Sequence, residues 1–310
     1  MRHHGVLAAV LVVAGLVVVG SGGPAFGQVK FERKYAEETK AVSRLETKAD
    51  QTITVAGMDI KQKSSSFILQ STQIGKRRAD GTLSLEKKVD TLQAEYDFGG
   101  IKLQFDSGNP DKKADDARLQ VILDALKASL QGSTIIVLNK ANELQEVKVD
   151  PKVVEALPEA FRSNATADKA KARVNQELSL LPQTSVKPGE TWDVTHTMAL
   201  DGSQSFEFVT AYTFTGNVEK DGKSLQRVEV QDKSVKYAME ADAKGGAQVS
   251  KSDLKVTESQ GEILFDAVAG RVQQRANKVR IVGDITLVIA GVNYPAKLDL
   301  TLDTKETVEP

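Results

Sequence analysis

Histidine, serine and lysine could support nucleophilic or metal chemistry in this chain, but few of them are spaced for it. Of the three histidines, only His196 lies beyond the first 27 residues. Zinc sites usually combine several His or Cys ligands, and the chain has no cysteine, which also excludes thiol catalysis. Ser203 and Ser205 lie near His196, but no nucleophile-elbow motif accompanies them. We therefore interpret His196 as a polar strand residue and predict no catalytic residue, no metal site and no cofactor.

Two Ser-x-x-Lys sequences, Ser84–Lys87 and Ser252–Lys255, could in principle pair a serine nucleophile with a lysine. Both lie in stretches with strand-like alternation. The Ser-Asp-Asn and Lys-Thr-Gly motifs that accompany such a serine in penicillin-binding proteins are absent. We interpret both matches as chance in a chain rich in Ser and Lys.

Two charged clusters offer weaker signals. The acidic segment 106–116 has oxygen ligands for Ca²⁺. Gly108 and Pro110 occupy ligand positions of an EF-hand loop, so we prefer a turn that leads into a helix. The basic segment Lys76–Arg78 is interpreted as charge that protects a strand edge, with binding to an anionic surface as the alternative.

The first 27 residues have the pattern of a secretory signal peptide. Arg2 supplies a basic start, the apolar run from Val6 to Val19 follows, and Ala25 and Gly27 place small residues at −3 and −1 before Gln28. The run is shorter than the roughly 20 residues that span a membrane, and no later segment is apolar enough to do so. We predict an exported, periplasmic or extracellular protein that is soluble after cleavage.

The composition of the remaining chain narrows its partners. The net charge of −1 at pH 7 becomes −2 when the segment with Arg2 is removed, and this near-neutral balance argues against nucleic acid as a partner. Without cysteine there is neither a disulfide nor a lipid-modified N-terminal cysteine. Stability must therefore come from a core, and 310 − 27 = 283 residues are enough to build one.

The alternation of apolar and polar residues divides the chain after the signal peptide into a β block, a mainly helical insert with a short hairpin, and a second β block, at 28–110, 111–182 and 183–310. Val29–Leu45 alternates with period two and predicts the first strand, and Ala79–Gly81 predicts a hairpin turn. Val292–Leu302 predicts a long strand with one wet face. Pro295 indicates that this last strand is at an edge of the sheet.

The insert is predicted to contain three helices. Apolar residues at spacings of three and four indicate a helix over Leu119–Leu130, with Gly132 as its C-cap. Asp150-Pro151 predicts the N-terminus of a second helix, and Thr166 that of a third. A short hairpin is expected over 135–149.

The segment Lys187–Trp192 is the most distinctive short motif. Pro188 and Gly189 at its centre have the chemistry of a type II turn, which redirects the chain from the insert into the next strand. Trp192 is the only tryptophan, and we expect it to anchor that corner in the core.

Together these features predict an α+β fold. We count roughly ten strands, and long amphipathic antiparallel strands must cover their apolar face with another layer. The simplest arrangement is a single domain over 28–310, in which one strongly curved antiparallel sheet forms a half-barrel and the central helices cover its concave face. Two separate domains, one for each β block, stay open as the alternative.

The order of several motifs resembles a family of exported bacterial proteins of unknown function that is abundant in planctomycetes. The motifs are Phe105–Pro110, the helix over Leu119–Leu130, the hairpin after it, Leu181-Pro182 and Val186–Trp192. The resemblance implies no catalytic residues. At the level of the fold, the plan is similar to the half-barrel carriers represented by the lipoprotein-localisation proteins and the mycobacterial exported lipid carriers. That similarity implies an apolar cavity between sheet and helices, but the lipidation cysteine of anchored members is missing here.

Three functions follow as hypotheses. The first is a non-enzymatic carrier or sensor of an apolar small molecule or lipid, because a large apolar sheet face beneath helices favours an apolar pocket. The second is a structural or interaction protein of the cell envelope with no small ligand and an unknown protein partner. The third is a hydrolase that acts through paired carboxylates. The residues expected to line the pocket of the first are Phe206, Phe208, Tyr212, Phe214, Leu298 and Leu300, beneath Ile122, Leu126 and Leu130.

Overall fold

A single antiparallel sheet dominates the structure. The computed structural model describes residues 27–111, 113–199, 204–239 and 248–309. In these residues twelve strands pair in the order β6-β5-β3-β2-β1-β12-β11-β10-β9-β8-β7, and β4 also pairs with β3. The strands are β1 (Lys40–Val55), β2 (Met58–Ile74), β3 (Leu83–Phe98), β4 (Ile101–Asp106), β5 (Ser133–Leu138), β6 (Leu144–Val149), β7 (Thr191–Ala199), β8 (Gln204–Lys220), β9 (Lys223–Met239), β10 (Gln248–Asp266), β11 (Arg271–Ile289) and β12 (Val292–Glu309).

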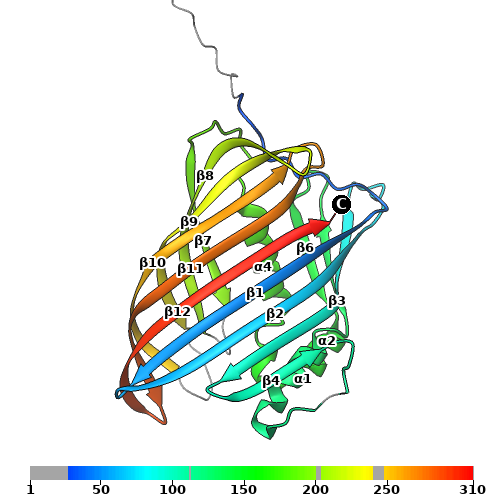
Figure 1. Cartoon of the computed structure of the whole chain (residues 1–310). Coiled ribbons are helices and arrows are strands. Elements are labelled where there is room, and N and C mark those ends of the chain that lie inside the picture. The colour runs from blue at the N-terminus through cyan, green and yellow to red at the C-terminus, as the bar shows by residue number, and fades with distance from the viewer. Residues whose placement is uncertain (1–26, 112, 200–203, 240–247, 310) are drawn as a thin grey trace, which may run out of the picture.

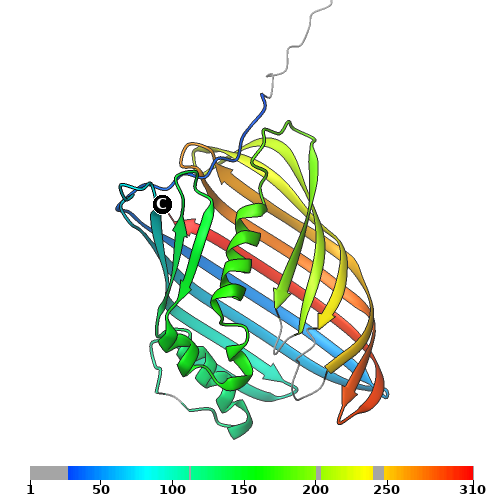
Figure 2. The same ribbon diagram turned by 180° about the vertical axis from the view of Figure 1, so that it is seen from behind.

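The first and last strands join the two β blocks. β1 pairs with β12 from Val42 opposite Glu309 to Val55 opposite Ala296, so the two blocks form one sheet. The sheet is strongly curved, and its end strands β6 and β7 do not pair with each other (Figures 1 and 2). The fold is therefore mostly β, with the open half-barrel that the strand pattern predicts.

Alternation along each strand decides which side chains face the concave side. On β12, Ala296, Leu298 and Leu300 are buried, whereas the intervening Lys297 is exposed. The concave face carries two separate apolar clusters. One contains Phe214, Val228, Ile263 and Phe265, and the other contains Phe206, Phe208, Val279, Ile281, Leu298 and Leu300.

The helices are fewer and smaller than an α+β fold with a helical layer would need. They are α1 (Gln120–Ala128), α2 (Pro151–Ala156), α3 (Glu159–Arg162) and α4 (Ala167–Ser179), with a 3₁₀ turn at Ala117–Leu119. Only α4 runs across the open concave side, whereas α1 and α2 lie near β4 at one end of the sheet (Figures 1 and 2). The predicted helical cover is thus present in part. None of the helices in the described ranges is both long and apolar enough to span a bilayer.

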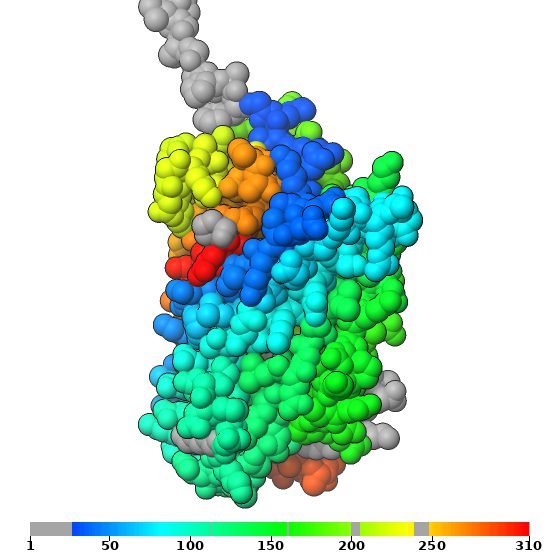
Figure 3. Space-filling view, turned by 90° about the vertical axis from the view of Figure 1, so that its right-hand side faces the viewer, coloured from blue at the N-terminus to red at the C-terminus, as the bar shows by residue number. Residues whose placement is uncertain are grey.

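Several local predictions are confirmed. Asp150 accepts a hydrogen bond from the backbone N–H of Lys152 at the start of α2, and Thr166 accepts one from Lys169 at the start of α4. The hairpin predicted over 135–149 is β5–β6. Figure 3 shows this insert packed along one flank of the molecule, with the N-terminal segment over one end.

The strand predicted over Val29–Leu45 is wrong in its first part. β1 begins at Lys40, and the preceding residues lie outside the sheet apart from a bridge between Val29 and Val186, with a turn at residues 37 and 38. Phe31 is 1% exposed and packs edge-on against Phe214 and Phe265. An extended segment that plugs the end of a core has the same alternation as a strand, so the pattern alone could not separate the two.

Two further predictions are wrong for positional reasons. β12 is central, but its pairing with β1 ends at Ala296, so Pro295 lies where β12 has only β11 as a neighbour. Its missing N–H therefore costs no ladder bond towards β1.

Gly132 is not a left-handed C-cap, because α1 already ends at Ala128. A Cβ at Gly132 would lie 2.4 Å from a methyl carbon of Val153, so close packing requires glycine there.

Arg77 joins three segments that meet at the end of β2. Its guanidinium donates to the carbonyl oxygen of Gly81 (2.8 Å), the carbonyl oxygen of Asn139 (3.2 Å) and the side chain of Asn142 (2.8 Å). Its backbone N–H donates to Glu37 of the N-terminal segment. The basic cluster Lys76–Arg78 therefore contains a residue that ties the β2–β3 turn to the β5–β6 turn.

We expect Arg77→Met to lower the free energy of unfolding by about 2 kcal/mol, because three partly buried acceptors lose a charged donor. The neighbouring Arg78→Met, at an exposed position, should change it by less than about 0.5 kcal/mol. Guanidinium unfolding of both variants measures the difference. Equal effects of the two substitutions would contradict the role given to Arg77.

Candidate functional site

Helix α4 bridges the two unpaired edges of the half-barrel. It packs against β6 on one side. On the other side, the side-chain amide of Gln176 accepts from the backbone N–H of Thr197 on β7 (3.2 Å) and donates to the carbonyl oxygen of the same residue (3.4 Å). This side chain thus satisfies backbone groups of the edge strand that no neighbouring strand pairs.

The C-terminal end of α4 is fixed at the turn before β7. Gly189 has φ +89° and Glu190 donates its backbone N–H to the carbonyl oxygen of Lys187, which closes the turn around Pro188. The Trp192 indole donates to the carbonyl oxygen of Leu180 (2.9 Å) and stacks on Tyr212 with ring centroids 6.0 Å apart. Trp192 therefore connects the end of the helix to the sheet.

A cavity of about 580 Å³ lies between α4 and the concave face of the sheet. The segment 33–39, which leads into β1, borders it at one side. Much of its wall is apolar and comes from strands β1, β2, β3, β5, β10, β11 and β12, from α4 and from the two residues that follow α4. These apolar residues include Ile74, Leu85, Ile136, Leu138, Val174, Leu178, Leu180, Leu181, Ile263, Val272 and Val308.

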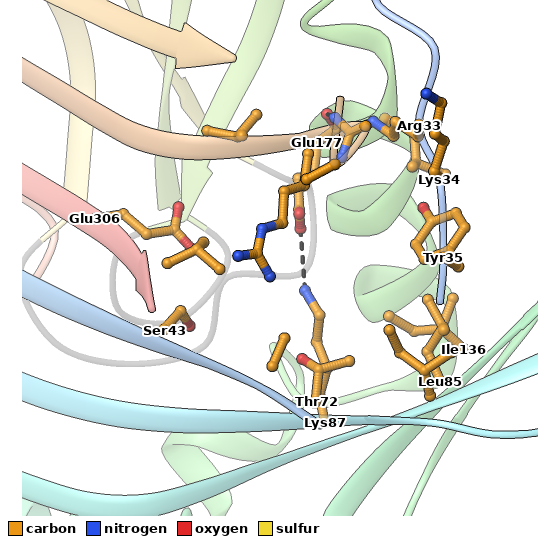
Figure 4. A pocket seen from close by; sticks show the side chains of 18 of the residues that line it. Arg33, Lys34, Tyr35, Ser43, Thr72, Leu85, Lys87, Ile136, Glu177 and Glu306 are labelled. Atoms are coloured by element: carbon orange, nitrogen blue, oxygen red, sulfur yellow. Dashed lines mark hydrogen bonds and ion pairs between the residues drawn. The ribbon is translucent and has the colours of Figure 1, made fainter. Parts of the chain in front are cut away.

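Two ion pairs project into this cavity. The ammonium of Lys87 (β3) lies 3.3 Å from the carboxylate of Glu177 (α4), and the guanidinium of Arg275 (β11) lies 3.4 Å from that of Glu306 (β12). Figure 4 shows Lys87 and Glu177 reaching towards each other, with Tyr35, Leu85 and Ile136 on one side and Ser43 and Glu306 on the other. Arg33 donates to the backbone carbonyl oxygen of Glu177 (2.7 Å), so the N-terminal segment is held to α4.

The electrostatics of Glu177 reflect this position. Surrounding protein atoms oppose its ionisation, but the positive charges of Lys87, Arg33 and Arg275 outweigh them and lower its pKa. Its side chain is nevertheless 46% exposed, because it borders the cavity. Burial raises the pKa of the nearby Tyr35 hydroxyl. The cavity therefore holds an ionised carboxylate between cations at physiological pH.

A buried polar network lies beside the two apolar clusters of the concave face. Asp232 accepts hydrogen bonds from Thr210 (2.5 Å), Asn277 (2.9 Å) and Ser259 (3.3 Å). The His196 imidazole lies 3.3 Å from the Thr210 hydroxyl, and burial lowers its pKa. Thr210 donates to the carboxylate but is fully buried, so its hydroxyl is not accessible to a substrate in this structure.

The serines considered as nucleophiles are not placed for catalysis in the described part of the chain. Ser203 lies outside the described residues. Ser205 has the opposite parity on β8 to Phe208, which stacks on His196. Ser84 and Lys87 are three residues apart on β3 and so face opposite sides of the sheet. Ser252 and Lys255 are likewise three residues apart on β10, in a stretch of regular register with β11, and so face opposite sides of the sheet.

The acidic segment forms turns. Asp106 accepts from the backbone N–H of Gly108, and Asp116 accepts from Arg118 at the 3₁₀ turn. Hydrogen bonds from Arg118 lower the pKa of Asp116 to about 2. No group of three or more potential metal ligands occurs among the described residues.

The structure distributes the predicted lining residues over three clusters, and none of them borders the cavity beneath α4. Phe206, Phe208, Leu298 and Leu300 pack together on the concave face. Tyr212 and Phe214 pack with Phe31 and Phe265. Ile122, Leu126 and Leu130 pack with β3 and β4 and do not contact the first group.

Sequence reasoning missed the charged residues of the cavity, although a signal for them exists. Lys87 and Glu306 occupy inward positions on strands whose other inward positions are mainly apolar or small: Leu83 and Leu85 on β3, Leu298 and Leu300 on β12. A charge at the apolar parity of a long strand marks a position that faces an interior site.

Comparison with known proteins gives only distant structural similarity. No protein-family model and no curated protein sequence matches this chain, so the resemblance to the planctomycete family is unsupported. Lipovitellin, solved to describe its lipid–protein interactions, is similar with a TM-score of 0.45 and 10% identity over 89% of this chain. The match spans 26% of lipovitellin's length.

Channel-type structures are more distant still. OccK5 (OpdH) of Pseudomonas aeruginosa has a TM-score of 0.25 and 6% identity, over 88% of this chain and 99% of its own. An outer-membrane channel of Pseudomonas putida F1 has a TM-score of 0.22 and 10% identity, over 90% and 98% of the two chains. At these values the similarities carry no functional argument.

The lowered pKa of Glu177 predicts a pH-dependent contribution to stability. A carboxyl group whose pKa is lower in the folded state stabilises the fold above its ordinary value of 4.5, and the contribution is lost as the pH falls through the folded value. We expect Glu177→Gln to lower the free energy of unfolding near neutral pH by under about 1 kcal/mol, since the side chain is half exposed. The thermal midpoint should fall accordingly. The two proteins should converge well below pH 4.5.

Thermal melts over a pH series measure this difference. Glu219→Gln, at an exposed position of β8, is the matched control and should follow the wild type throughout. A destabilisation by Glu177→Gln that persists unchanged into strong acid would show that packing, and not charge, is responsible.

Proposed function

We propose that this protein is a non-enzymatic carrier or binding protein for an apolar molecule such as a lipid. The observation that supports this most directly is the cavity of about 580 Å³ beneath α4. Pockets of roughly 300–1,000 Å³ with a mainly apolar wall and a few polar groups are typical of small-molecule sites. The cavity beneath α4 has both properties.

The way α4 is attached also supports binding. The helix packs against β6, but it meets β7 through one amide side chain and β3 through one ion pair. A single amphipathic helix over an open sheet can shift without breaking a strand ladder. We therefore infer that ligand entry involves displacement of α4 from one edge of the half-barrel.

Export and absence of catalysis are part of the same proposal. The pattern of residues 1–27 predicts a signal peptide, most of which lies outside the described residues. A carrier of apolar molecules is useful in an aqueous compartment between membranes or outside the cell, where such molecules cannot diffuse freely. In this proposal the polar groups near the cavity orient a ligand and transform nothing.

A second candidate, an interaction protein of the cell envelope, is favoured by one observation. Met58, Ile60 and Val292 are 69%, 59% and 51% exposed at the tips of the neighbouring β1–β2 and β11–β12 hairpins. Exposed apolar groups that lie together mark contact surfaces. Protein that is free of ligand and self-associates through these residues, with loss of association in Met58→Lys, would favour this candidate.

Native and denaturing mass spectra of the chain from Gln28 to Pro310, purified from bacteria, test the carrier proposal first. We expect a lipid-sized mass in the native spectrum that is absent after denaturation. A clean ligand-free mass, together with no uptake of a fluorescent fatty acid or phospholipid, would overturn the proposal.

Filling the cavity tests its position. Val174→Trp places a large side chain on the face of α4 that borders the cavity, and we expect it to weaken binding of a fluorescent fatty acid by about tenfold or more. Val121→Trp, at a position of α1 that is 42% exposed, is the control and should bind as the wild type does. Equal binding by both variants would place the ligand elsewhere.

A further inference from the structure

The charges that border the cavity beneath α4 are unbalanced. Four cations, Arg33, Lys87, Arg271 and Arg275, share its wall with two carboxylates, Glu177 and Glu306. Two other lysines of this wall have partners elsewhere, because Lys34 donates to the carbonyl oxygens of Ala267 and Val268 and Lys40 pairs with Asp90. The cavity therefore carries an excess of positive charge.

An excess of cations over carboxylates is not expected where the charged side chains of a cavity serve only to pair with one another. A cation in a region of low dielectric is costly unless an anion or polar groups compensate it. The Nε of Arg271 is buried and has no hydrogen-bond partner among the described residues. Arg33 donates to a backbone carbonyl oxygen, which carries no full charge, and hydrogen-bonds to Tyr35. The positive charges of Arg33 and Arg271 are therefore not neutralised by the two carboxylates of the wall, which pair with Lys87 and Arg275.

We propose that the ligand is an anionic amphiphile whose carboxylate or phosphate headgroup binds between Lys87 and Arg275. This inference rests on the proposed carrier function and specifies its ligand. Lys87 on β3 and Arg275 on β11 reach the cavity from opposite parts of the sheet. The positive charges of both residues lower the pKa of Glu177. An anion placed between Lys87 and Arg275 would therefore contact a cation on each side.

The apolar part of the ligand has a defined path beside this headgroup site. Leu85 and Ile136 lie next to Lys87 on the sheet, and Tyr35 and Val174 cover them from the N-terminal segment and α4. These side chains form one continuous wall on one side of the ion pair, as Figure 4 shows for Tyr35, Leu85 and Ile136. A single acyl chain along this wall would leave its charged end at Lys87.

The carboxylates have a definite part in this arrangement. Glu177 and Glu306 hold the side chains of Lys87 and Arg275 over the cavity, at 3.3 Å and 3.4 Å. Both Lys87 and Arg275 carry donors in excess of these single contacts. A headgroup anion can therefore add to the existing pairs and neutralise the excess charge without leaving either carboxylate unpaired.

Competition against a bound fluorescent fatty acid tests the inference with palmitate, hexadecyl phosphate and hexadecanol. The three share a chain length and differ in the headgroup. We expect the wild type to bind palmitate or hexadecyl phosphate at least about tenfold more tightly than hexadecanol. The preference should decrease with ionic strength. Comparison of the two anions distinguishes a fatty-acid carboxylate from a phospholipid phosphate.

Charge-neutral double substitutions assign the preference to residues. Lys87→Met/Glu177→Gln and Arg275→Met/Glu306→Gln each remove a cation together with its partner, so neither leaves an unpaired charge. We expect each to reduce the ratio of anion to alcohol affinity by about fivefold or more while hexadecanol binding stays within about twofold. Lys40→Met, which borders the same cavity but whose ammonium pairs with Asp90, is the control and should keep the wild-type ratio. Circular dichroism checks that each variant folds.

The outcomes separate the two proposals. Equal binding of acid and alcohol by the wild type would overturn the anionic headgroup. A preference for the anion that both double variants retain would overturn the placement of the headgroup between Lys87 and Arg275. Either outcome would leave an apolar carrier. Failure of every amphiphile to displace the probe, with no binding of the probe itself, would overturn the carrier function and the headgroup site together.

Discussion

The structure depends on one constraint: a long, curved antiparallel sheet that does not close must cover its concave face and its two free edges. β6 and β7 are the two end strands of the sheet, and no strand pairs with their outer sides. Unpaired backbone groups at such an edge can pair with strands of other molecules. Helix α4 covers part of the concave side, and its Gln176 amide hydrogen-bonds to the backbone of Thr197 on the edge strand β7. A single helix cannot fill a half-barrel, so a cavity remains beneath it.

That cavity explains why charged side chains occur inside an apolar interior. Lys87, Glu177, Arg275 and Glu306 are tolerated because they pair and border open space. Elsewhere on the concave face, buried polar groups bond to one another, as Thr210 and Asn277 do around Asp232. The difference between the two sites, one open and one closed, is what favours the first as a place for a ligand.

Much of the fold could be predicted from local pattern. The hairpins, the capping residues Asp150 and Thr166 and the wet face of β12 follow from side chains that act on their own backbone or on one face of their own strand. The errors occur where one pattern suits two structures. The alternation before Lys40 suits a strand as well as the extended segment that places Phe31 in the core, and Pro295 suits an edge strand as well as the end of a neighbour's pairing.

The sequence by itself determined that the chain forms long amphipathic antiparallel strands around a cysteine-free core, because period-two alternation and turn residues act locally. Only the tertiary structure decided which strands are neighbours and which side chains meet. Lys87 and Glu177 are 90 residues apart and form a pair only because the sheet curves beneath α4. Periodicity assigns a face to each residue but no partner across that face, so the cavity and its charges emerge only when the sheet and the helix are assembled.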